Sequence, residues 1–327
     1  MRLTEHTQTK MALGSDVSLT LVTREGASDV EALFTHLWRA IFEFERRFSR
    51  FLPASELSQI NARAGLRTPI SPAMHDLLKG AREMSTLTDG LYNPFILPAL
   101  QRAGYVGSAA PGYEHDPVDN HSKRTVVDPG QLQLGDDWVS IPFDSALDLG
   151  GCGKGYLADA LRGEVATESV HGYVFSLGGD VATWGRGADD APWVIYIQEA
   201  GGNPNQHPTA VVCPNEGFGV ATSGTFPRGN QPQMAKTHHI IDPATLQPAQ
   251  TAVKLATVGA PRALVADVLA SCAVILGAGR AHEVVDEMGA RALLLQCAGD
   301  DKDYTQICVD QSRPSVLTSR PLGAVHA

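Results

Sequence analysis

Apolar and polar residues alternate over 17–24, VSLTLVTR, as is typical of a half-buried strand. Over 29–48 the apolar positions recur at helical spacing, and Asp29 stands where an N-cap is expected. The stretch 74–87 predicts a second helix. A polar segment with Pro and Gly follows at 107–130 and predicts a surface loop.

Short apolar runs typical of strands dominate the second half of the chain. They lie at 146–149, 173–177, 193–198, 209–213, 218–222, 238–241, 253–259 and 292–297. Pro261 predicts the start of a helix, because Pro is well placed in a first turn, and a further helix is expected at about 280–288. Since strands outnumber helices and do not alternate regularly with them, the pattern favours an α+β fold over a doubly wound sheet.

Composition limits the class of protein. The chain has 327 residues, 43% of them hydrophobic, which is enough for a large core, and its net charge of −10 argues against nucleic-acid binding. The N-terminal stretch has no apolar region of signal-peptide length, and no run approaches a membrane span. Five cysteines without CxxC spacing indicate neither a disulfide framework nor a zinc site. We therefore expect a cytoplasmic enzyme or binding protein.

A glycine-rich turn follows the first of these apolar runs, in LDLGGCGKGYLADAL at 147–161. Glycines let the main chain approach a ligand closely, and Asp148 and Lys154 flank this turn with opposite charges. A phosphate-binding P-loop would need Gly where Asp148 stands and Ser or Thr where Gly155 stands, and no GxGxxG fingerprint is present. A second double glycine followed by an acid lies in FSLGGDVATWG at 175–185. Ligand binding and tight strand–helix packing both remain open for these turns.

Two further clusters carry candidate chemistry. Asp267 and Ser271 are four residues apart in an apolar helical stretch, so their oxygens share one face and suit a hard cation such as Mg²⁺; a hydrogen bond within the helix is the alternative. The pair His238–His239 precedes Ile-Ile-Asp-Pro at the end of a predicted strand, where an imidazole could move protons or be structural. Ser223, in ATSG, lacks the GxSxG context of a nucleophile elbow.

Taken in order, these segments resemble the ApbE family, the FAD:protein FMN transferases. The resemblance covers nearly the whole chain and rests on eight motifs in family order: ALGSDVSLTL, FSRFLPASELSQIN, TDGLYNPFILPAL, DLGGCGKGYLAD, SLGGD, ATSG, HHIIDP and ADVLASCAVILG. It implies a single domain over 1–327 with a bilobed α+β fold related to the tunnelling fold. FAD would lie in the cleft between the two interlocked lobes.

The resemblance also implies a reaction. A Ser or Thr hydroxyl of a target flavoprotein would attack the FMN phosphorus of FAD, with Mg²⁺ on the phosphates and AMP as the leaving group. Asp267, Ser271 and the main-chain carbonyl of Gly151 match the family's metal ligands, and His239 matches its histidine, a candidate for proton transfer. The positions that match FAD contacts are Leu13, Phe51, Leu91, Tyr92, Asn93, Asp148, Lys154 and Ile241.

The chain departs from the family pattern at several positions. Ser271 stands where Thr is usual, Phe51 where Tyr is frequent, and Asn93 and Phe95 where an acid and Thr are usual. The turn 245–248 reads TLQP in place of TGxP. Two alternatives to the transferase therefore stay open: an FAD pyrophosphatase that uses water as the nucleophile, and a non-catalytic flavin-binding protein.

Overall fold

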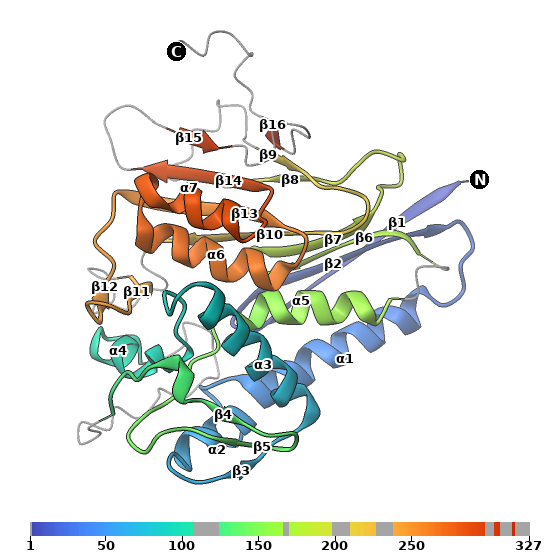
Figure 1. Cartoon of the computed structure of the whole chain (residues 1–327). Helices are drawn as coiled ribbons and strands as arrows, with labels where there is room; N and C mark the ends of the chain where they lie inside the picture. The colour runs from blue at the N-terminus through green and yellow to red at the C-terminus, as the bar shows by residue number, and fades with distance from the viewer. Residues whose placement is uncertain are drawn as a thin grey trace, which may run out of the picture.

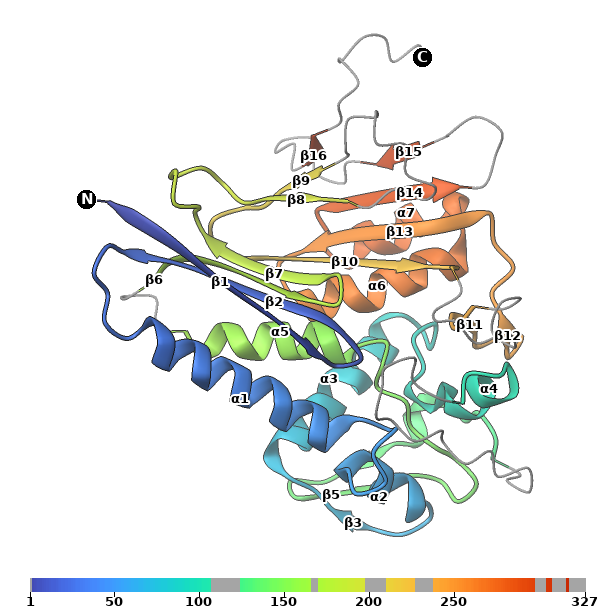
Figure 2. The same ribbon diagram turned by 180° about the vertical axis from the view of Figure 1, so that it is seen from behind.

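The computed structural model describes residues 2–106, 124–165, 170–197, 210–226 and 238–297, with two short strands beyond them. Its centre is an eight-stranded antiparallel sheet with the strand order β1-β2-β6-β7-β10-β13-β14-β15 (Figures 1 and 2). The strands are β1 Leu3–Ala12, β2 Ser15–Arg24, β6 Val170–Leu177, β7 Asp180–Gly185, β10 Phe218–Gly224, β13 Val253–Ala260, β14 Ala292–Cys297 and β15 Tyr304–Ile307.

Four helices cover one face of this sheet, as both views show. They are α1 Val30–Phe48, α5 Gly153–Gly163, α6 Ala263–Leu276 and α7 Ala278–Glu287. The apolar stripe of α1, with Phe34 and Leu37, packs in one core cluster with Leu19 of β2 and Phe175 of β6. The burial of this stripe accounts for the helical spacing seen in the sequence.

The elements between residues 56 and 140 gather beyond these four helices, on the side away from the sheet (Figure 1). They are α2 Glu56–Ala62, β3 Thr68–Pro69, α3 Pro72–Leu87, the 3₁₀ turns Pro94–Ile96 and Pro129–Gln131, α4 Leu97–Arg102, β4 Gln133–Leu134 and β5 Trp138–Ser140. Leu264 and Val268 of α6 share a core cluster with Met74 and Leu77 of α3. Because other residues of α6 pack with β13, this helix is apolar almost all round.

Two small sheets complete the described fold. A hairpin joins β11 Ile241–Asp242 to β12 Gln247–Pro248, and β8 Val194–Tyr196, β9 Ala210–Val212 and β16 Val316–Leu317 form a three-stranded sheet. Among the described residues, no helix is long and apolar enough to cross a membrane.

Most elements predicted from the sequence are confirmed, including the α+β class. The predicted helices 29–48, 74–87 and 280–288 correspond to α1, α3 and α7, and the helix expected near Pro261 begins at Ala263. Strands β2, β6, β8, β9, β10, β13 and β14 lie where they were predicted. The sequence pattern gave no signal for β1, β7, α2 or α4.

Some predictions were wrong. The run 146–149 is not a strand, because Leu147 makes both backbone hydrogen bonds with the side chain of Asn61, at 2.9 and 2.7 Å. Of the predicted strand 238–241, only Ile241 lies in a strand, β11. The His238 side chain accepts the Ile240 amide and donates to the Ala249 carbonyl, so these two backbone groups are bonded to a side chain. Asp29 occupies the N-cap position of α1, but its side chain makes no capping hydrogen bond. In the predicted loop, 107–123 lie outside the described residues, and a 3₁₀ turn begins at Pro129.

Candidate active site

All twelve residues predicted as site residues line a single cavity of ≈ 610 Å³. They are Leu13, Phe51, Leu91, Tyr92, Asn93, Asp148, Gly151, Lys154, His239, Ile241, Asp267 and Ser271. These residues come from segments far apart in the chain: the β1–β2 turn, the end of α1, the segment before α4, the glycine turn, the segment into β11, and α6. The fold therefore brings every predicted position together.

Two tight hairpin turns form one wall of the cavity. Leu13 and Gly14 join β1 to β2, Gly178 and Gly179 join β6 to β7, and all four have positive φ angles. This backbone is that of the two-residue turns that suit the twist of antiparallel strands. Because β2 and β6 are paired next to the turns, the two tips lie side by side at the start of α5 (Figure 2).

The glycine turn is fixed by a buried ion pair. Asp148 accepts a hydrogen bond from the Gly150 amide at 2.8 Å, and its other carboxylate oxygen lies 2.7 Å from Nε of Arg50. The two side chains are only 10% and 5% exposed, so a charge left there without its partner would be costly. Lys154, in the first turn of α5, forms a second ion pair with Asp180. Both cations are thus held at the cavity by carboxylates.

Helix α6 presents its two polar residues to the same space. A carboxylate oxygen of Asp267 accepts a hydrogen bond from the Gly155 amide at 3.0 Å, and the side chain is buried. The hydroxyl of Ser271 lies 2.9 Å from that of Ser223 on β10. The sequence left open a hydrogen bond between Ser271 and its own helix. The structure instead places the Ser271 hydroxyl against a residue of the sheet.

Gly155 sets the distance between α5 and α6. A Cβ at this position would lie 2.5 Å from the carbonyl oxygen of Ala263 and 2.8 Å from Cβ of Asp267. The sequence left open whether these glycines serve packing or ligand approach. At Gly155 the structure shows packing, and this packing holds Asp267 at the glycine turn.

We expect Gly155→Ala to destabilise the protein by about 1–3 kcal/mol, because the two helices must separate. Gly163, the last residue of α5, is the control, since a Cβ there meets nothing within 4 Å. Thermal unfolding of both variants checks this. An unfolding temperature for Gly155→Ala equal to that of Gly163→Ala would contradict the close contact.

The two histidines have different surroundings. His238 donates from Nε2 to the Ala249 carbonyl at 3.0 Å and accepts the Ile240 amide at Nδ1, and burial lowers its pKa. His239 lines the cavity, where its ring stacks on Tyr105 with centroids 5.7 Å apart. His238 is therefore bonded to the backbone around it, and His239 is the histidine that lines the cavity. The carboxylate of Asp242 accepts a hydrogen bond from the Ala244 amide.

Much of the remaining cavity wall is apolar or aromatic. Phe51 and Tyr92 belong to it, together with Phe44, Phe48, Leu91, Leu100, Ile240, Ile241 and Ile275. Burial raises the pKa of the Tyr92 phenol and of the Cys152 thiol, which lies in the glycine turn. Both groups are thus protonated near neutral pH, which argues against Cys152 as a nucleophile.

The donors in the cavity suit a hard cation that also binds a substrate. Asp267 offers carboxylate oxygens, Ser271 a hydroxyl and Gly151 a main-chain carbonyl, all oxygen donors. Within the described ranges, no group of three His, Cys, Asp or Glu residues could hold a metal alone. This set fits Mg²⁺, which commonly takes one or two carboxylates and completes its shell with substrate phosphates and water.

The comparisons with known proteins agree with this geometry. The family model described as "ApbE family" matches residues 13–294. This chain belongs to the ApbE family. A relative named FAD:protein FMN transferase, from Salmonella typhimurium, is 29% identical over 239 residues, which are 71% of this chain and 67% of the relative. A relative of the same name from Klebsiella pneumoniae is 26% identical over 94% of this chain and 90% of its own length.

Solved structures of ApbE proteins share the fold. The apo form of Pseudomonas stutzeri flavinyl transferase ApbE superposes with a TM-score of 0.78 at 20% identity, covering 94% of this chain and 96% of its own. The ApbE protein of Thermotoga maritima gives a TM-score of 0.75 at 24% identity, covering 93% and 97%. The match of the family model, and not these structures, confirms the family predicted from the eight motifs.

The cavity of this ApbE-family protein also holds residues that the sequence argument did not select. Arg50, Tyr105, Asp180 and Ser223 all line it. The guanidinium of Arg50 lies 4.1 Å from the Phe51 ring centroid and donates to the Tyr105 carbonyl at 3.0 Å. The sequence feature that could have predicted Arg50 as a site residue is its position between two phenylalanines in FSRFLP. No sequence feature predicts Tyr105, because its place in the cavity depends on the fold.

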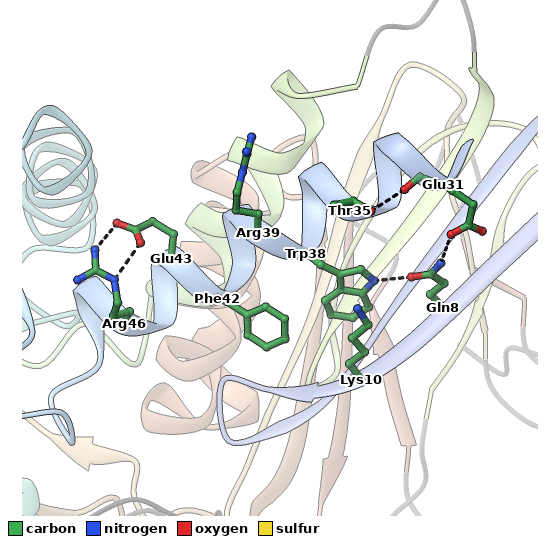
Figure 3. Close-up of a pocket in the computed structure, with 9 residues that line it drawn as sticks. All are labelled: Gln8, Lys10, Glu31, Thr35, Trp38, Arg39, Phe42, Glu43 and Arg46. Atoms are coloured by element: carbon green, nitrogen blue, oxygen red, sulfur yellow. Dashed lines mark hydrogen bonds and ion pairs between the residues drawn. The ribbon is translucent and has the colours of Figure 1, made fainter. Parts of the chain in front are cut away.

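A second hollow of this ApbE-family protein lies between α1 and β1, on the outer side of α1 (Figure 3). Its polar side chains mainly bind one another. Trp38 donates to Gln8 at 2.8 Å, Gln8 donates to Glu31, and Arg46 pairs with Glu43 (Figure 3). The hollow carries one more cation than carboxylates, and none of the residues predicted from the family motifs lines it. We therefore assign the chemistry to the cavity that those residues line.

Proposed function

We propose that this chain is an FAD:protein FMN transferase, which moves the FMN part of FAD to a Ser or Thr hydroxyl of a target flavoprotein and releases AMP. The observation that carries the proposal is the convergence of twelve family-matched residues on one cavity. Family membership and the shared name of the curated relatives support it.

The cavity offers two environments that FAD requires. Its apolar and aromatic wall, with Phe51 and Tyr92, suits the flavin ring. Its polar end, with the glycine turn and the first turn of α5, presents the Lys154 cation to phosphates. We infer that FAD binds here, with its diphosphate at the glycine turn.

Asp267, Ser271 and the Gly151 carbonyl would hold Mg²⁺ beside the diphosphate. A bound Mg²⁺ supplies charge neutralisation to the phosphates during transfer. The hydrogen bond from the Gly155 amide restricts the Asp267 carboxylate before any ligand enters, so the oxygens are already oriented.

His239 is the candidate general base. The acceptor hydroxyl would give its proton to the imidazole while its oxygen bonds to the FMN phosphorus, and the bond from that phosphorus to the AMP phosphate oxygen would break. AMP then leaves with the bridging oxygen. Stacking on Tyr105 limits how the His239 ring can turn, which suits a positioned base.

The decisive experiment is incubation with FAD and Mg²⁺, with and without a candidate flavoprotein acceptor, followed by mass spectrometry. We expect AMP and an FMN–protein adduct in equal amounts, and little AMP without the acceptor. Free FMN and AMP formed equally fast without acceptor would identify an FAD pyrophosphatase. Bound FAD with no product under either condition would identify a flavin-binding protein.

Affinity gives an independent prediction. We expect FAD to bind more tightly than FMN, because its adenylate half adds contacts in the same cavity that FMN lacks. Fluorescence titration of each flavin measures this, with Mg²⁺ present in both series. Equal affinities would indicate a generic flavin site and would argue against FAD as the substrate.

The cytoplasmic location expected from the sequence stays a proposal.

A further inference from the structure

Ser223 has no role in the reaction described so far. It lies on β10, is 8% exposed and lines the cavity, and its hydroxyl oxygen is 2.9 Å from that of Ser271. Two hydroxyls at this distance form one hydrogen bond, and either can be the donor. Which one donates decides what each can offer to a ligand.

A cation at Ser271 would fix that direction. A hydroxyl that ligates a metal directs a lone pair at it, so its proton must point to another acceptor. The Ser223 oxygen is such an acceptor, at hydrogen-bonding distance. Ser223 would then direct its own proton elsewhere, and the cavity that it lines would hold phosphate oxygens.

We propose that Ser223 is a positioning residue for the metal–diphosphate centre: it accepts the Ser271 proton, so that a lone pair of Ser271 faces the cation, and donates its own proton to a phosphate oxygen. This inference rests on the proposed function. No bond is made or broken, because the relay only orders two hydroxyl protons.

The placement of both residues supports such a role. Ser223 pairs with Ala256 near the end of β10, which is an interior strand of the large sheet, and Ser271 lies on a buried helix packed on that sheet. Ser271 has no second group on Cβ and therefore rotates more freely than Thr or Val. A fixed partner at 2.9 Å restricts that rotation.

The test measures metal binding and not turnover. Mn²⁺, a hard oxygen-seeking cation visible by electron paramagnetic resonance, is titrated into protein saturated with FAD. We expect Ser223→Ala to bind Mn²⁺ about five- to thirty-fold more weakly, the loss of a hydrogen bond to a charged centre. Ser223→Thr, which keeps the hydroxyl, should restore most of the affinity.

A double-mutant comparison shows whether Ser223 acts through Ser271. In a Ser271→Ala background, adding Ser223→Ala should weaken Mn²⁺ binding by less than about two-fold. Thr257→Val is the matched control, because it removes one hydroxyl of the neighbouring pair Thr222–Thr257, whose oxygens are 2.8 Å apart. Its Mn²⁺ affinity should equal that of the parent.

The outcomes distinguish a failure of the proposed role of Ser223 from a failure of the proposed function. Parent-like Mn²⁺ binding by Ser223→Ala, or an equal loss in the Ser271→Ala background, would overturn this inference alone. A parent protein that binds FAD but shows no Mn²⁺ binding would overturn the proposed metal-dependent function and this inference with it. Thermal unfolding of each variant confirms that the compared proteins are folded.

Discussion

We expect Asp267→Asn to lower Mg²⁺-dependent FMN transfer by at least about a hundred-fold while the protein stays folded. The substitution keeps the size of the side chain and an oxygen that can accept the Gly155 amide, but it removes the negative charge. Charge stabilisation by a catalytic metal is worth several kcal/mol, and about 1.4 kcal/mol is a factor of ten in rate. Initial transfer rates over a Mg²⁺ series measure the effect.

Asp159 provides a matched control for Asp267. Its carboxylate accepts the amides of Ala263 and Leu264 at the start of the same helix, at 2.8 and 3.1 Å, and it does not line the cavity. Asp159→Asn should lower stability by about 1 kcal/mol, as loss of a helix cap does, with the Mg²⁺ dependence unchanged. A parent-like rate and metal response in Asp267→Asn would refute its assignment as a ligand.

The second large effect is expected at His239. His239→Ala should lose transfer by about 10²–10⁴-fold, the usual worth of a general base, and should still bind FAD and Mn²⁺. Rates under saturating FAD, with acceptor present, give the comparison. Retained binding is the part of the result that separates a lost base from a damaged cavity.

His238→Ala is the neighbouring control. His238 makes two backbone hydrogen bonds and does not line the cavity, so its loss should lower stability and leave the transfer rate within a few-fold of the parent. A larger rate loss in His238→Ala than in His239→Ala would reverse the assignment. Parent-like rates in both would place proton transfer on another group.

The sequence was informative where a local pattern reflects a local cause. The stripe that includes Phe34 and Leu37 predicted α1, because a helix that buries one face must repeat apolar residues at its own period. Spacing alone placed Asp267 and Ser271 on one face of a helix, and the structure confirms this. The motif order identified the family, because each motif is weak alone and only the series is specific.

The sequence was uninformative where a cause lies far along the chain. The apolar run that includes Leu147 predicted a strand, but the backbone of Leu147 is hydrogen-bonded to the side chain of Asn61, 86 residues earlier. Arg50 and Tyr105 enter the cavity only because the fold brings the end of α1 and the end of α4 to the glycine turn. The pairing of Ser223 with Ser271, 48 residues apart, has no sequence signature either.

The two tight turns at the cavity also limit how this protein can change during evolution. Leu13–Gly14 and Gly178–Gly179 are two-residue links between their strands, and both turns depend on positive φ angles. One inserted residue would change the turn type and push its tip into the cavity or away from it. Insertions and deletions should therefore be absent from these two turns among close homologues, so that their length becomes a marker of an intact site.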